Sequence, residues 1–185
     1  MQKVVLNFLI SIILPSYLLT VSVSCNNQNK SRQIIEKPLN ISIFLDLSDR
    51  LMRNLEPSQM SRDTAIIGYI ADYFKSHTLG PQILQSKNSI KIFFYPAPHS
   101  SDIATLANEL SVNMEQYKGK DKRIALEKMK AKFQNNLTQI YNKTISEKNW
   151  IGCDIWDFFN SKKVDSQCIK KGARNINHSY RWVSI

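Results

Sequence analysis

The sequence predicts an α/β fold built on a mainly parallel sheet. Two apolar segments rich in β-branched and aromatic residues, 41–47 and 89–95, are predicted to be strands, and their nearly continuous apolar character is typical of strands covered on both faces. Between them, residues 60–77 repeat apolar side chains at helical spacing. Because a helix of this length suits a crossover connection, the economical arrangement is a right-handed βαβ unit with parallel strands.

These elements have local reasons to begin and end where they do. Ser58 or Ser61 can cap the helix with its hydroxyl group, and the Leu-Gly-Pro sequence at 79–81 ends it. Pro96 and Pro98 follow the second strand, and proline has no backbone N–H with which to continue a sheet.

Three further helices are predicted after the second strand. A short helix over 102–110 precedes a long amphipathic helix over 122–145, and a last helix begins near Asp154. The apolar stripe of the long helix is expected to face the core. Its members are Leu126, Met129, Phe133, Leu137, Ile140 and Tyr141.

The first 24 residues have the architecture of an export signal. One lysine precedes a long apolar run that Pro15 interrupts, and small residues then lead to Cys25. A transmembrane helix is the alternative, but the proline and the small residues favour cleavage. Residues 25–37 are polar and are predicted to be a tether. The roughly 160 residues after the signal fit one domain with a real core.

The formal net charge of +10 is compatible with a nucleic-acid partner, an anionic lipid surface or a solvated basic surface. The lysines are spread over several segments, including 118–132 and 162–171, without the glycine and aromatic residues typical of nucleic-acid-binding surfaces. A solvated surface is therefore favoured and no nucleic-acid partner is expected. An acidic membrane surface is a secondary candidate.

Cysteine and histidine give no sign of a disulfide framework or a zinc site. Cys153 and Cys168 could pair in an oxidising periplasm, but their neighbourhoods lack CxxC spacing, and two buried thiols are favoured. The histidines, His77, His99 and His178, lack zinc-ligand spacing.

The segment 46–49, Asp-Leu-Ser-Asp, ends the first predicted strand and is the best clue to chemistry. Oxygen-bearing side chains at the carboxyl end of a strand lie where α/β folds bind ligands, and hard oxygens suit Mg²⁺, Mn²⁺ or Ca²⁺. A capped turn is the alternative interpretation. Asp154 can likewise be a helix N-cap instead of a ligand.

Residues 21–25, Val-Ser-Val-Ser-Cys, resemble the lipobox of a bacterial lipoprotein signal, with Ser22 in the place of the usual aliphatic residue. The resemblance implies that Cys25 is lipidated and anchors the chain to a membrane. Asn26 is not the aspartate that retains lipoproteins in the inner membrane. The implied location is the cell envelope, on the outer membrane and facing the periplasm.

The strand ending in Asp-x-Ser, the helix after it, the second strand and the segment 152–159 together resemble the von Willebrand factor type A domain over residues 38–175. The resemblance implies a Rossmann-like three-layer fold and an adhesion role without enzymatic turnover. In that family a metal-ion-dependent adhesion site holds a cation with one position open to a carboxylate from a protein partner.

The family's site carries over to this chain as a degenerate one. Asp46 matches the leading aspartate and Ser48 the first serine, while Arg50 stands where the second serine belongs. A cation cannot ligate a cation, so Asp49 is the residue that can compensate. Cys153 replaces a threonine, with Asp154 beside it. The implied cofactor is Mg²⁺ or Ca²⁺, or none if truncation has removed the function.

The family also places an apolar strand ending in aspartate after its last helix, and residues 176–185 do not contain one. With codons rich in A and T, these residues can be encoded so that reading one base later gives Leu-Ile-Ile-Leu-Thr-Asp-Gly-Tyr-Leu. The hypothesis is that the chain is a truncated, frameshifted family member with an aberrant tail over 176–185.

Two other functions compete with this interpretation. A strand ending in an acidic motif also resembles the haloacid dehalogenase phosphotransferases, in which Asp46 would be the nucleophile, but Ser48 takes the place of their second aspartate. The other alternative is a basic membrane-surface protein without a specific site.

Overall fold

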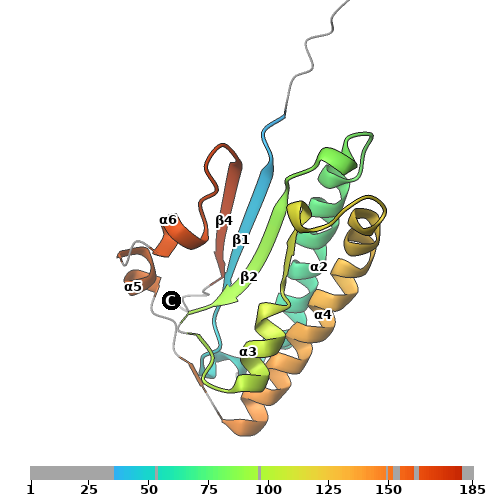
Figure 1. Cartoon of the computed structure of the whole chain (residues 1–185). Coiled ribbons are helices and arrows are strands. Elements are labelled where there is room, and N and C mark those ends of the chain that lie inside the picture. Colours follow the sequence, from blue (N-terminus) through green and yellow to red (C-terminus); the bar gives the residue numbers. More distant parts are fainter. Residues whose placement is uncertain are drawn as a thin grey trace, which may run out of the picture. The chain divides into compact units, whose positions relative to one another are not determined.

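A computed structural model of the chain describes residues 36–52, 54–95, 97–148, 150–151, 155–160 and 163–180. The chain divides into two units, Met1–Glu36 and Lys37–Ile185. All the elements named below belong to the second unit, which is an α/β structure with a mixed, mostly parallel sheet (Figure 1). The predicted class and the mainly parallel sheet are therefore confirmed.

Four strands form the sheet in the order β3-β2-β1-β4. β1 (Leu39–Leu45) lies inside the sheet and pairs in parallel with β2 (Ser89–Phe94) and with β4 (Arg174–Tyr180), whereas β3 (Ser111–Asn113) pairs antiparallel with β2. The chain thus leaves β1 for a neighbour on one side and returns much later to the other side. The order of the strands reverses at β1, and ligands bind at such a switch point in open α/β sheets.

The helices match the predicted positions closely. α2 (Gln59–Thr78), α3 (Ser101–Asn108) and α4 (Asp121–Glu147) are followed by two short helices, α5 (Ile155–Asn160) and α6 (Lys163–Gln167). Of the two predicted caps for α2, the Ser58 hydroxyl accepts the Ser61 backbone N–H at 3.2 Å. Short 3₁₀ turns, η1 (Asp49–Met52), η2 (Ile83–Gln85) and η3 (Met114–Gln116), complete the connections.

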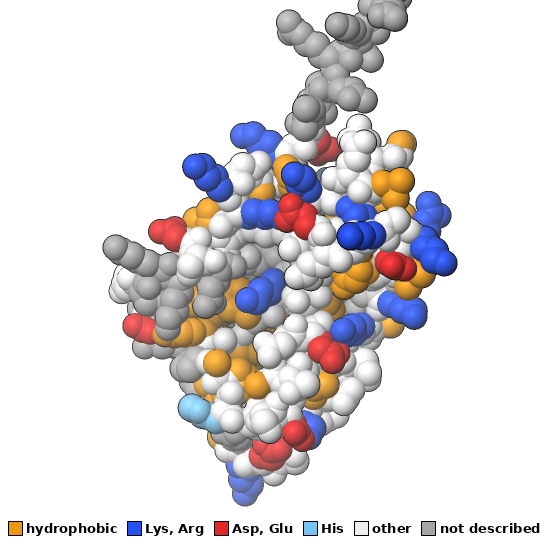
Figure 2. Space-filling model, in the orientation of Figure 1, with side chains coloured by type: hydrophobic (Ala, Val, Ile, Leu, Met, Phe, Trp, Pro, Cys, Tyr) orange, Lys and Arg blue, Asp and Glu red, His pale blue; other side chains and the backbone are white. Residues whose placement is uncertain are grey.

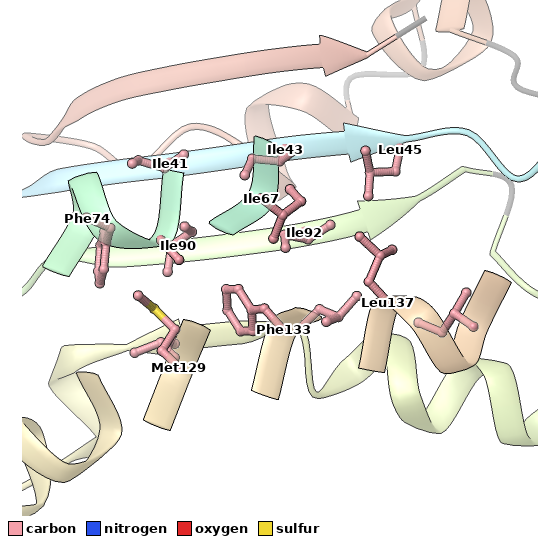
Figure 3. Close-up of a cluster of buried hydrophobic side chains, with 14 of the residues drawn as sticks. Ile41, Ile43, Leu45, Ile67, Phe74, Ile90, Ile92, Met129, Phe133 and Leu137 are labelled. Atoms are coloured by element: carbon pink, nitrogen blue, oxygen red, sulfur yellow. The ribbon is translucent and has the colours of Figure 1, made fainter. Parts of the chain in front are cut away.

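The larger core lies between one face of the sheet and helices α2, α3 and α4. Alternate side chains of β1 and β2 point toward Ile67 and Phe74 of α2 and Phe133 of α4 (Figure 3). All six apolar residues predicted for the α4 stripe are at most 1% exposed, which confirms that this stripe faces the core. Of the residues that recur at helical spacing in 60–77, Ile67 and Phe74 are buried, whereas Tyr73 is 42% exposed.

The two short helices lie on the other face of the sheet (Figure 1). Phe44 of β1 and Phe93 of β2 pack there against Phe158 of α5, with ring centroids 5.2–5.5 Å apart. Cys168 belongs to this cluster as a free, buried thiol, and its burial raises its pKa. The predicted buried thiol is thereby confirmed for Cys168, while Cys153 lies outside the described residues.

The domain expected from the sequence ends at residue 175, but the sheet continues past it. β4 runs to Tyr180, and Ile176 lies opposite Ile41 of β1. β4 is a polar strand at the edge of the sheet, and its Asn175 donates to the backbone oxygens of Lys170 and Ala173 and accepts from Asn40. None of the described helices is both long and apolar enough to cross a membrane.

Candidate functional site at the carboxyl end of β1

Asp46 follows the last residue of β1 and is 4% exposed. Its neighbours Leu45 and Leu47 are buried in the larger core, so the backbone on both sides of the aspartate is held in place. The Leu47 oxygen also accepts the Ile151 backbone N–H at 3.0 Å, which attaches the chain before α5 to this strand end. The fold therefore fixes a carboxyl group at the carboxyl end of an interior strand.

Ser48 makes two hydrogen bonds to this carboxyl group. Its backbone N–H donates to Asp46 Oδ1 and its hydroxyl group donates to Asp46 Oδ2, both at 2.8 Å. Such a turn, in which an aspartate accepts from the backbone two residues on, is favoured by short polar side chains. The structure thus brings together two of the predicted site residues. The same two side chains form the capped turn that was the alternative interpretation of this segment.

Asp49 takes a different position from the buried pair. Its side chain is exposed, and the residue is the first of η1. In this turn the Leu51 N–H donates to the Ser48 backbone oxygen at 3.3 Å. The structure therefore does not bury its carboxyl group alongside that of Asp46.

Asp154 and Cys25, the other two predicted site residues, lie outside the described residues. The helix that follows Asp154 is nevertheless held at the same end of the sheet, because the Tyr95 hydroxyl beyond β2 donates to the Asp157 carboxyl group of α5. Among the residues that the structure describes, no three Asp, Glu, His or Cys side chains are grouped so that they could hold a metal ion. Of the predicted ligands that the structure describes, Asp46 and Ser48 lie together, and Asp49 lies apart from them.

A second buried acid, Asp63 in the first turns of α2, was missed by the sequence analysis. It is 2% exposed, accepts the Gln59 Nε2 at 2.8 Å on one carboxyl oxygen and accepts the Tyr141 hydroxyl at 2.7 Å on the other. Asp63 precedes the buried Ile67 by one helical turn, so its place on the core side of α2 is visible in the spacing. Its partner in α4 is not, because 78 residues separate the two.

Surface ion pairs connect the helices around the site. Lys143 of α4 donates to Asp102 of α3 at 2.8 Å, and this hydrogen bond is the main reason why the pKa of Asp102 is lowered. The same contact raises the pKa of Lys143. Both side chains are exposed, so this contact holds α3 and α4 together only weakly.

Comparison of the chain with protein-family models, curated proteins and solved structures gives no match. The α/β class by itself hosts enzymes and binding modules alike, so the function rests on the side chains. The feature that distinguishes this chain is the buried Asp46 with Ser48 bonded to it.

Proposed function

We propose that the chain is an envelope-anchored binding protein of the von Willebrand factor type A kind, with a degenerate site for Mg²⁺ or Ca²⁺ at the carboxyl end of β1. The observation that supports this proposal is the buried Asp46 carboxyl group, held by Ser48 at the strand where the sheet order reverses. In this proposal a protein partner supplies a carboxylate to the cation, and the chain itself carries out no turnover.

The side chains fit such a cation only in part. Ca²⁺ takes six to eight oxygen ligands and Mg²⁺ six, so Asp46 and Ser48 would supply a minority of them. Each carboxylate oxygen has two lone pairs, so accepting a hydrogen bond from Ser48 does not prevent an oxygen from ligating a cation. Asp49, Asp154, water and the partner would complete the shell. A site with so few protein ligands is expected to be weak unless the partner is bound.

The phosphotransferase alternative gains nothing from the same contacts. Phosphoryl transfer of this kind needs a general acid two residues after the nucleophile. Ser48 stands at that position, and its hydroxyl group donates its proton to Asp46. Binding therefore fits the geometry better than phosphoryl transfer.

The cation site is tested by titrating the full chain, purified from bacterial membranes in detergent, with MgCl₂ and CaCl₂ in a calorimeter. We expect weak binding with a dissociation constant on the order of 10⁻⁴–10⁻³ M, as in extracellular calcium modules. Asp46→Ala is expected to abolish the heat of binding. Asp72→Ala removes an exposed acid from α2 and serves as the matched control that leaves binding unchanged.

If the unmodified chain gives no heat of binding at about 10⁻² M cation, ten times the highest dissociation constant expected, the chain has no cation site. Hydrolysis of a generic phosphate ester that Asp46→Asn abolishes would establish the phosphotransferase instead. Binding that survives Asp46→Ala would place the cation elsewhere.

We also propose that residues 176–185 are encoded out of frame. In support, β4 begins at Arg174 beside β1, where the type A resemblance requires an apolar strand, and the shifted reading replaces the polar Asn177 by isoleucine. We expect the gene, read one base later from the codon of Ile176, to encode Leu-Ile-Ile-Leu-Thr-Asp-Gly. Sequencing the gene decides the matter, since a stop codon or polar residues in that frame would contradict the proposal.

A further inference from the structure

Exposed cations from distant parts of the sequence gather at the amino end of the sheet, where β1, β2 and β4 begin and β3 ends. Figure 2 shows Lys and Arg side chains concentrated toward this end, which is the upper one in Figure 1. The exposed members of this basic edge are Lys37, Lys87, Lys118, Lys120, Arg123, Lys171 and Arg174. Some of the lysines that looked scattered in the sequence therefore lie at one end of the fold.

Backbone hydrogen bonds connect the segments that carry these cations. The Arg174 N–H donates to the Pro38 oxygen at 2.8 Å, and the Met114 N–H donates to the Asn88 oxygen at 2.9 Å. The Leu39 N–H donates to the Asn88 side chain at 2.8 Å. Four separate chain segments are thus hydrogen-bonded to one another at this end of the sheet.

Two further lysines near this edge make contacts within the domain. Lys122 is buried and donates to the Ser86 oxygen at 2.8 Å, and Lys170 pairs with Glu115 at 2.6 Å. With that pair set aside, the acids described at this edge are Glu36 and Asp121, against seven exposed cations. The opposite end of the sheet mixes both signs, with exposed Asp49, Glu56, Asp102 and Glu147 near Arg62, Lys143 and Lys148.

We propose that the basic edge docks on a surface of anionic lipid headgroups. Two observations select this partner: the charge is complementary to such a surface, and the preceding chain joins the domain at Lys37, in the middle of the basic edge. Cys25, the proposed lipid anchor, is 12 positions earlier, and so few residues span at most about 40 Å when fully extended. The anchor therefore keeps this edge close to the membrane.

Docking in this way would orient the candidate site. The strands run from the basic edge to Asp46, so a domain that rests on lipid through its amino end presents the carboxyl end of β1 to the periplasm and to a partner. The inference rests on the envelope location proposed above but not on the cation site. The experiment below involves no divalent cation, so its outcome does not depend on that site.

The test uses the full chain reconstituted into vesicles of phosphatidylcholine alone or with about 30% phosphatidylglycerol, a fraction typical of anionic membrane surfaces. Lysines are acetylated with an activated ester and their rates are measured by mass spectrometry. We expect Lys37, Lys87, Lys118, Lys120 and Lys171 to react at least about threefold more slowly in the anionic vesicles, and about 0.5 M NaCl to reverse this protection by screening. Lys132 and Lys148, elsewhere on the domain, should react at equal rates in both.

A charge-reversed variant, Lys118→Glu with Lys120→Glu and Lys171→Glu, should lose the protection of Lys37 and Lys87. The variant with Lys132→Glu, Lys143→Glu and Lys148→Glu changes the charge equally and should keep it. Equal labelling of the basic edge in neutral and anionic vesicles would overturn the proposal, as would stronger protection by duplex DNA than by anionic lipid. Failure of the chain to float with neutral vesicles would instead contradict the lipid anchor.

Discussion

Replacing Phe133 with alanine is expected to lower the free energy of unfolding by about 4 kcal/mol, the largest of the changes predicted for this domain. Phe133 is fully buried at the middle of α4 and lies against the β1 and β2 side chains in the larger core (Figure 3). Its removal loses the transfer free energy of the ring and leaves a cavity that the surrounding β-branched side chains fill poorly. Urea unfolding followed by circular dichroism measures the change.

The matched control lies on the same helix. Ile124→Ala also removes a large apolar side chain from α4, but this one is 41% exposed, and we expect a change within about 0.5 kcal/mol. A loss of less than about 1 kcal/mol for Phe133→Ala would show that Phe133 does not pack against β1 and β2.

The fold was predictable where a short pattern carries the information. β1 and β2 are apolar at most positions and are largely buried, and α4 repeats its buried residues at helical spacing over 27 residues. Ser58 shows where α2 begins. In each case the residues that decide the structure are adjacent in sequence or one helical turn apart.

Two strands were not predicted, because long-range pairing determines them. β3 has three residues, which is too few for an alternating pattern to be recognised. β4 has the sequence Arg-Asn-Ile-Asn-His-Ser-Tyr, and its polar residues argue against a strand until its partner is known. At the edge of the sheet, pairing with β1 supplies the backbone hydrogen bonds that β4 needs, whatever side chains it carries.

The candidate site was likewise predictable only where its residues are adjacent in sequence. Asp46 and Ser48 were recognised because they directly follow an apolar strand, and the structure shows them bonded to each other. The expectation that Asp49 would act with them depended on the path of the chain after the strand, where η1 places its side chain in the solvent. Asp63 was overlooked although its spacing from Ile67 places it on the core side of α2, because its partner Tyr141 is 78 positions away in α4.

Positions far apart in sequence also determine how the charges are arranged. The cations of the basic edge come from the start of β1, the connection before β2, the start of α4 and the connection before β4. No window of the sequence contains them together, so net charge alone indicated only a solvated surface. The parallel sheet brings them together because parallel strands all begin at the same end.

The second largest effect is expected from Asp63→Ala, which should lower the free energy of unfolding by about 3 kcal/mol. The substitution leaves the Gln59 amide and the Tyr141 hydroxyl without their shared acceptor in a buried place. Loss of a buried acceptor costs more than the hydrogen bond itself contributed, because the donors that faced it cannot turn to water instead. Asp72→Ala on the same helix removes a surface pair with Lys130 and is expected to cost at most about 1 kcal/mol.

A double-mutant cycle with Tyr141→Phe separates the role of the pair from the general cost of changing the core. If the Asp63–Tyr141 hydrogen bond holds α2 against α4, the two substitutions should be non-additive by about 1 kcal/mol or more, because the second removes a bond that the first has already broken. Additive losses would show that each residue acts through other neighbours.

η1, which follows Asp46 and Ser48, packs against both α2 and α4. If Asp63 couples these two helices, Asp63→Ala should also weaken cation binding in the calorimetric titration, although Asp63 is not one of the proposed ligands. Unchanged binding in a destabilised Asp63→Ala chain would instead mean that the turn at Asp46 is held by β1 and Ser48 alone.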